Sequence, residues 1–283
     1  MIGSLIVSPS LPLSAGQPDT PAQFGEFNDA VSIGADPGGI IFILDRGTDQ
    51  LMKYSPEGML LLTSGGYGWQ GASFDRPSDF SLTEGLDIYI ADYGNHRIVR
   101  LDRQGTFVES FDLRPPGTAA AYGYPTGIAQ SRFGDIFVID GDNRQLISIG
   151  STRTVQNAFG GLGSGRGTLQ KPRRVRIGMS DRVFVLDDSA IVMFDLFGNF
   201  LGHAPGPSGS PVTTFAVDDH ALYVLSGTAV TAYDEGGSSR PVADLSTGQP
   251  EIASGDVVDF IVRGEKIYFL LKRSVVIRSV ADH

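Results

Sequence analysis

Nearly the same six residues occur four times in this chain: IIFILD at 40–45, DIYIAD at 87–92, DIFVID at 135–140 and RVFVLD at 182–187. Each stretch is a short apolar run that ends in an aspartate, and the aspartates follow one another after 47, 48 and 47 residues. A fixed period of this length is the signature of a repeat architecture in which each copy supplies one small structural unit. A residue that recurs in every copy is therefore expected to have a structural duty.

The clearest copy divides into four strands. Apolar stretches at 79–82, 87–91, 97–101 and 106–111 are separated by turn-forming residues. Four short antiparallel strands per repeat are typical of one β-propeller blade. Later copies keep only the alternation of apolar and polar residues, which still indicates strands. The sequence predicts an all-β fold, a six-bladed β-propeller of four-stranded antiparallel blades.

The best copy resembles a known repeat family. Its matching residues are Arg76-Pro77, the strand 88–92, the turn GNHRI at 94–98 and LDRQG at 101–105. Together they are similar to one NHL repeat, and the resemblance is strong over 76–150 and weaker over 27–66 and 171–202. It implies a six-bladed propeller scaffold, which hosts many different roles.

We expect the whole chain, 1–283, to be a single propeller domain. The blades are predicted at about 27–66, 76–114, 124–160, 171–204, 211–246 and 256–280. The last unit offers only three strands, so the apolar stretch 1–8 is predicted to pair with it as a fourth strand. Such a closing strand from the N-terminus would remove the exposed edges of an open array.

Composition excludes several classes of function. The formal net charge of −10 argues against nucleic acid as a partner, because phosphate neutralisation requires clustered Lys and Arg. The chain has no cysteine, so thiol catalysis and disulfides are excluded. Apolar runs are too short for a membrane span, so no direct membrane insertion is expected. We expect a cytoplasmic protein, or one at the periplasmic or extracytoplasmic face if an export signal was removed.

The recurring polar residues have structural interpretations. Aspartates at strand ends bond backbone amides of the following turn, so four of them are expected to be structural turn residues: Asp45, Asp92, Asp140 and Asp187. His96 lies in the turn of the best repeat, where the resemblance also implies a structural histidine. No catalytic residue is assigned, and no cluster with metal-ligand spacing is found.

The inner strands suggest a polar ring in the central channel. Aligned on Val31, Phe80, Ile128, Val175, Phe215 and Phe260, they place Ala30, Asp79, Gly127, Arg174, Thr214 and Asp259 at one level. Asp79, Arg174 and Asp259 would then come from alternate blades. One interpretation is a self-neutralised plug, and the other is a site for a small polar ligand or a divalent cation. No other cofactor is expected.

Aromatic residues in the inter-blade loops are the candidates for a partner interface: Tyr67, Trp69, Phe74, Tyr122 and Tyr124. The alternative is that they pack between blades. The favoured function is a non-catalytic scaffold for another protein, of unknown identity, for instance in a bacterial envelope or membrane-associated assembly. The alternative is a propeller hydrolase, lactonase or lyase, or a small-ligand sensor, that uses the channel mouth.

Overall fold

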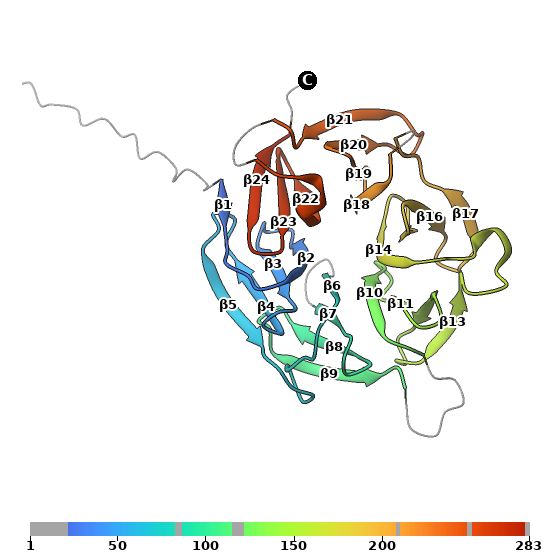
Figure 1. Ribbon diagram of the computed structural model, residues 1–283. Helices are drawn as coiled ribbons and strands as arrows, with labels where there is room; N and C mark the ends of the chain where they lie inside the picture. The colour runs from blue at the N-terminus through green and yellow to red at the C-terminus, as the bar shows by residue number, and fades with distance from the viewer. Residues whose placement is uncertain (1–21, 83–86, 115–121, 208–209, 248–250, 281–283) are drawn as a thin grey trace, which may run out of the picture.

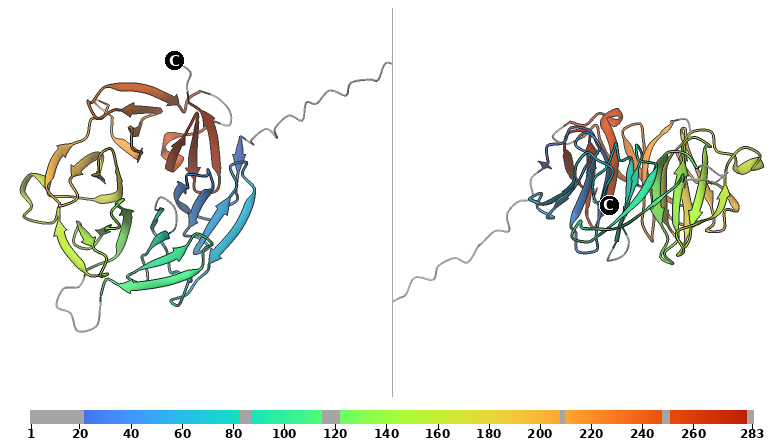
Figure 2. Two further views of the ribbon diagram at one scale, coloured as in Figure 1. Left: turned by 180° about the vertical axis from the view of Figure 1, so that it is seen from behind. Right: turned by 90° about the horizontal axis from the view of Figure 1, so that it is seen from below.

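The computed structural model describes residues 22–82, 87–114, 122–207, 210–247 and 251–280. Within them, six sheets of four antiparallel strands stand around a central channel, as the face-on view shows (Figure 1). Seen edge-on, the ring is a flat disc (Figure 2). None of the described elements is a helix long and apolar enough to cross a membrane. The fold is the predicted six-bladed β-propeller.

Each sheet is built from strands of two to seven residues. In the first three sheets the strands are β2 (Ala30–Ala35), β3 (Ile41–Asp45), β4 (Gln50–Tyr54), β5 (Leu60–Gly65); β6 (Asp79–Leu82), β7 (Asp87–Asp92), β8 (Arg97–Asp102), β9 (Phe107–Asp112); β10 (Pro125–Gln130), β11 (Ile136–Asp140), β12 (Gln145–Ile149), β13 (Val155–Phe159). In the last three they are β14 (Pro172–Gly178), β15 (Arg182–Asp187), β16 (Ala190–Phe194), β17 (Phe200–His203); β18 (Val212–Val217), β19 (Leu222–Ser226), β20 (Ala229–Tyr233), β21 (Ser239–Asp244); β22 (Val257–Arg263), β23 (Lys266–Leu271), β24 (Val275–Ser279), β1 (Gln23–Phe24). Two single turns of 3-10 helix, Gly165–Gly167 and Ser254–Asp256, lie in inter-blade loops.

The order of strands within a blade defines two faces of the disc. The first strand of each sheet lines the channel and the last lies at the rim (Figure 1). Inner strands begin on the side where the inter-blade loops run, which we call the loop face. They end on the side that carries the first hairpin of each blade, which we call the hairpin face.

The ring is closed by β1, which pairs antiparallel with β24 through Gln23 opposite Val276 and Phe24 opposite Val275. An N-terminal strand therefore completes the sixth sheet, but it comes from 23–24. The predicted closing segment 1–8 lies outside the described residues, and that detail is not confirmed. A two-residue strand has no periodicity to reveal it in the sequence.

The hydrophobic core lies between neighbouring blades. One buried cluster joins Ile33 and Ile43 of the first blade to Tyr268 and Leu270 of the sixth, with Phe24 at its rim. Alternate residues of each middle strand point to the two adjoining blades, because side chains alternate along a strand. The apolar runs of the repeat are thus buried on both sides, which is why they lack polar residues.

Candidate functional site: the central channel and the loop face

The register of the sheets identifies the residues that share one level of the channel. Ile33 lies opposite Ile43, as Phe80 lies opposite Ile90 and Phe260 opposite Phe269. The first inner strand is therefore aligned on Ile33, two residues beyond Val31, on which the sequence alignment relied. In this register Ser32 lies opposite Leu44, as Asp79 lies opposite Ala91 and Asp259 opposite Leu270. The ring residue of the first blade is consequently Ser32 and not Ala30.

A buried network of two arginines and two aspartates occupies the middle of this channel. Arg174 of β14 donates to Asp259 of β22, two blades further round the ring. Arg176, two residues further along β14, donates to Asp79 of β6 at 2.8 Å and to Asp259 at 3.2 Å. Ser32 of β2 lies between the two carboxylates and donates to Asp79 at 2.7 Å. Four blades are thus connected across the axis.

Both carboxylates also hold neighbouring blades together through backbone amides. Asp79 accepts a hydrogen bond from the Ile128 amide at 3.2 Å, and Asp259 accepts one from the Ile33 amide at 3.2 Å. Each carboxylate further accepts the amide of the residue that follows it. Every oxygen of the two carboxylates therefore already accepts a hydrogen bond. Neither carboxylate is free to accept a proton from a substrate.

The electrostatics of Asp79 favour a permanently charged carboxylate. Burial opposes its ionisation, but the guanidinium of Arg176 and then that of Arg174 outweigh burial and hold the pKa of this carboxyl below its usual value. A general acid or base at neutral pH requires the opposite change in a carboxyl group. Asp79 is thus suited to an ion pair and not to proton transfer.

The sequence brought three of the five network residues to attention. Asp79, Arg174 and Asp259 do lie at one level, but Arg174 bonds only Asp259 among them. Sequence reasoning missed Arg176, which bonds both aspartates. Its spacing of two from Arg174 was the available signal, because residues i and i+2 share one face of a strand.

The network does not fit a bound divalent cation. Two guanidinium groups already occupy the space between the carboxylates, and they would repel a metal ion. Among the described residues no group of three or more His, Cys, Asp or Glu side chains could hold a metal. The arrangement has the chemistry of an ion-pair network.

The four repeated aspartates tie loops on the loop face to strand ends. Asp45 accepts the amides of Asn28 and Asp29 at 2.9 and 2.8 Å and that of Gly47 at 3.0 Å. The corresponding bonds of the other three reach the amides of Asp75, Gly123, Gln170 and Lys171. The main partners are therefore in the loop that precedes each inner strand, whereas the sequence argument considered only the turn that follows.

The loop between the first two blades presents two exposed aromatic side chains. Tyr67 is 75% exposed and Trp69 is 69% exposed, while Phe74 in the same loop is fully buried. Phe74 anchors the loop in the core between these blades. The Gly68 amide bonds the Phe74 carbonyl at 2.9 Å, and Asn95 bonds the Gly68 carbonyl at 2.8 Å. Phe74 is thus a support and is not available to a partner.

The next loop contributes a smaller, half-buried aromatic group. The ring of Tyr124 stacks on Tyr93 at 4.5 Å and contacts His96 at 4.1 Å, measured between ring centroids. The guanidinium of Arg114 lies 5.2 Å from the Tyr124 ring. Tyr122 packs against the core between the second and third blades. Among the five aromatic residues predicted for an interface, Tyr67 and Trp69 are therefore the most accessible to another molecule.

Comparisons with known proteins agree with this fold. A family model of the NHL repeat matches residues 74–101. No curated protein matches the chain by sequence. The chain thus contains an NHL repeat within a six-bladed β-propeller.

Solved structures with similar folds include two lyases and a hydrazine synthase. A streptogramin B lyase is 12% identical with a TM-score of 0.64, covering 91% of this chain and 96% of that one. A catalytically inactive virginiamycin B lyase of Staphylococcus aureus, in which a histidine is replaced by alanine, is 12% identical with a TM-score of 0.62, covering 94% and 97%. Kuenenia stuttgartiensis hydrazine synthase is 12% identical with a TM-score of 0.58, covering 92% and 77%. At this identity the likeness concerns the fold.

Proposed function

We propose that this propeller is a non-catalytic scaffold that binds another protein through its loop face. The observation that carries the proposal is the exposure of Tyr67 and Trp69 on a loop that Phe74 and Asn95 hold in place. Large aromatic side chains with few rotatable bonds, fixed before binding, lose little entropy on association and are frequent energetic centres of interfaces.

The channel supports the same proposal. Its acidic side chains are paired with arginines and accept backbone amides, so neither is poised for proton transfer. The inactive virginiamycin B lyase variant lacks a histidine, whereas His96, the histidine of the NHL turn, packs against Tyr124 on the loop face. No described histidine lines the channel pocket described below. An enzyme of the lyase kind is therefore not the favoured function.

The experiment compares immobilised protein variants in a lysate of the source organism. Tyr67 and Trp69 are replaced by serine in one variant, and Phe133 and Phe197, exposed aromatics of the hairpin face, are replaced in a matched control. We expect wild type and control to retain the same stoichiometric partner and the Tyr67→Ser, Trp69→Ser variant to lose it. Equal retention by all three proteins, or no stoichiometric partner, would refute the proposal.

Trp69 provides an independent readout because it is the only tryptophan of the chain. Its fluorescence in the free protein should be strongly quenched by acrylamide, since most of the side chain is exposed. Addition of the purified partner should protect it from quenching. Unchanged quenching in a complex shown to form would place the interface elsewhere.

A further inference from the structure

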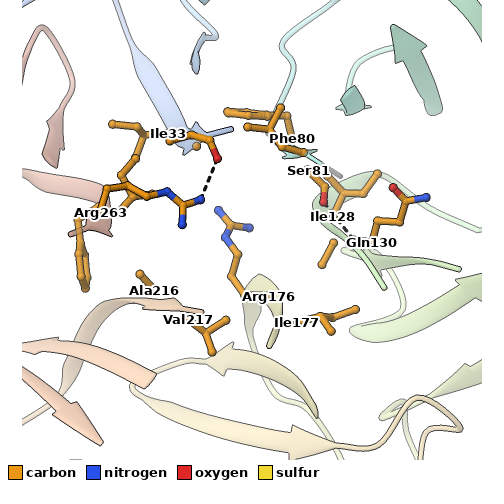
Figure 3. A pocket seen from close by; sticks show the side chains of 16 residues that line it. Ile33, Phe80, Ser81, Ile128, Gln130, Arg176, Ile177, Ala216, Val217 and Arg263 are labelled. Atoms are coloured by element: carbon orange, nitrogen blue, oxygen red, sulfur yellow. Dashed lines mark hydrogen bonds between the residues drawn. The ribbon is translucent and has the colours of Figure 1, made fainter. Parts of the chain in front are cut away.

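The hairpin-face end of the channel is a pocket with its own chemistry. Its volume is about 180 Å³, and it lies beyond the arginine–aspartate network. Side chains of all six inner strands line it, and the guanidinium groups of Arg176 and Arg263 both point into it (Figure 3). Small residues of three blades, Gly34, Ala129 and Ala216, leave the space open.

We propose that this pocket binds a small hydroxycarboxylate. The first reason is charge. The described ionisable side chains that meet in the channel are three arginines, 174, 176 and 263, and two aspartates, 79 and 259. Asp79 and Asp259 are paired with Arg174 and Arg176, so the guanidinium of Arg263 adds a positive charge at the mouth of the pocket that attracts an anion.

The second reason is that Arg263 has no carboxylate partner among the described residues. Its recorded hydrogen bond goes to the Ala35 carbonyl at 2.8 Å, and no described carboxylate pairs with it. In Figure 3 the dashed line marks this bond while the rest of the guanidinium faces the pocket. A guanidinium presents donors in a planar fork that matches a carboxylate, and its charge makes such bonds stronger than neutral ones.

The third reason is the polar wall beside the arginines. Ser81 lines the pocket, and its hydroxyl oxygen accepts a hydrogen bond from the backbone amide of Gln130 at 3.0 Å. Its own proton is therefore free to donate to a ligand hydroxyl.

The remaining walls favour a ligand with an apolar part. Ile33, Phe80 and Ile261 make the other walls apolar. A short carbon chain with one carboxylate and one hydroxyl, such as lactate, fits these features. A phosphate dianion has no apolar part to pack against these walls.

The test measures binding of L-lactate and D-lactate by calorimetry and thermal shift at low ionic strength. Acetate, lactamide and inorganic phosphate serve as comparisons that lack the hydroxyl, the charge or the apolar part. We expect either lactate enantiomer to raise the melting temperature more than acetate does, and lactamide to have no effect. Absence of binding by both enantiomers, equal binding of lactamide, or tighter binding of phosphate would overturn the proposal.

Variants test whether lactate binds in this pocket or elsewhere on the surface. Arg263→Gln removes the free cation at an exposed position and should weaken lactate binding about tenfold or more. The matched control Arg240→Gln removes an exposed arginine of the rim strand β21 and should leave affinity unchanged. Equal affinity of the two variants would refute the role of Arg263.

A second variant fills the cavity and leaves every charge in place. Ala216→Leu puts a larger apolar side chain where the sixth blade already carries Ile261 at the equivalent position, so the fold should tolerate it. We expect lactate binding to disappear. Retained binding would show that the ligand lies elsewhere, and partner capture through the loop face should be unaffected by any of these variants.

Discussion

At the scale of single residues, the molecule depends on side chains that bridge blades. Asp79 alone connects its own strand to Ile128 of the third blade, to Ser32 of the first and to Arg176 of the fourth. Removing one partner of such a buried ionic network leaves the others without compensation, which costs more than the network contributes as a whole. Single substitutions here should therefore have large effects.

Asp79→Asn should lower the free energy of unfolding by roughly 3–5 kcal/mol at neutral pH. Because the folded state holds the pKa of Asp79 below its usual value, the wild type has this stability in full above about pH 4 and loses it as the pH falls further. The free energy of unfolding, measured with urea from neutral to acidic pH, should therefore fall less steeply below pH 4 in the variant than in the wild type. The exposed Asp219→Asn is the control, and parallel profiles of Asp79→Asn and wild type would contradict this account.

Divalent cations should not stabilise the protein through the channel. The two carboxylates are neutralised by Arg174 and Arg176, which a metal ion would have to displace. Thermal unfolding with calcium, magnesium or zinc should therefore match unfolding in a chelator. A cation-dependent rise that Asp259→Asn abolishes would restore the metal hypothesis.

At the scale of elements, the rim strands differ in how they protect their free edges. Four consecutive apolar residues are exposed along β5 and the turn before it, with Met59 at 64%, Leu60 at 53%, Leu61 at 46% and Leu62 at 37%. The rim strand β9 carries Glu109 and Asp112, and β21 carries Arg240 and Pro241, which disfavour pairing with another chain. The edge of the first blade lacks these features.

Leu61→Lys should reduce association between copies of the protein. A lysine on an exposed edge strand opposes strand pairing by charge, and Leu61 lies at a bulge where the ladder is already irregular. Light scattering at rising protein concentration should show slower growth of large species than in the wild type. Phe107→Lys on the rim strand β9 is the comparison. If both variants reduced association equally, the added charge and not the edge of the first blade would be the cause.

The closing strand is short but packs well. Phe24 is buried, and its ring lies 5.1 Å from the ring of Tyr54 between the sixth and first blades. Phe24→Ala should destabilise the protein by about 3–5 kcal/mol, measured by urea unfolding. Gln23→Ala, which keeps the backbone pairing and removes an exposed side chain, should change stability little. A small loss in Phe24→Ala, or an equal loss in Gln23→Ala, would contradict the packing role of Phe24.

At the scale of the whole molecule, the sequence was sufficient for the architecture because the repeat and the alternation are local patterns. Asp45, Asp92 and Asp140 mark strand ends whatever surrounds them. The channel required three-dimensional information. Only the strand pairing showed that Ser32 is the ring residue of the first blade, and Arg176 reaches across the axis to side chains 97 residues and 83 residues away in sequence. The exposure of side chains also could not be predicted from the sequence, because Trp69 and Phe74 lie in one loop and yet Trp69 is exposed and Phe74 is buried.

The pairing of β1 with β24 also has a consequence for biosynthesis. Phe24 leaves the ribosome before the other described strands are made, and its partner Val275 is made after nearly all of them. At 5–20 residues per second the interval is on the order of ten seconds or more. During translation the nascent chain therefore holds an unpaired first strand, and a prematurely terminated product can never complete its sixth sheet. Ring closure thus distinguishes chains that contain β24 from shorter products.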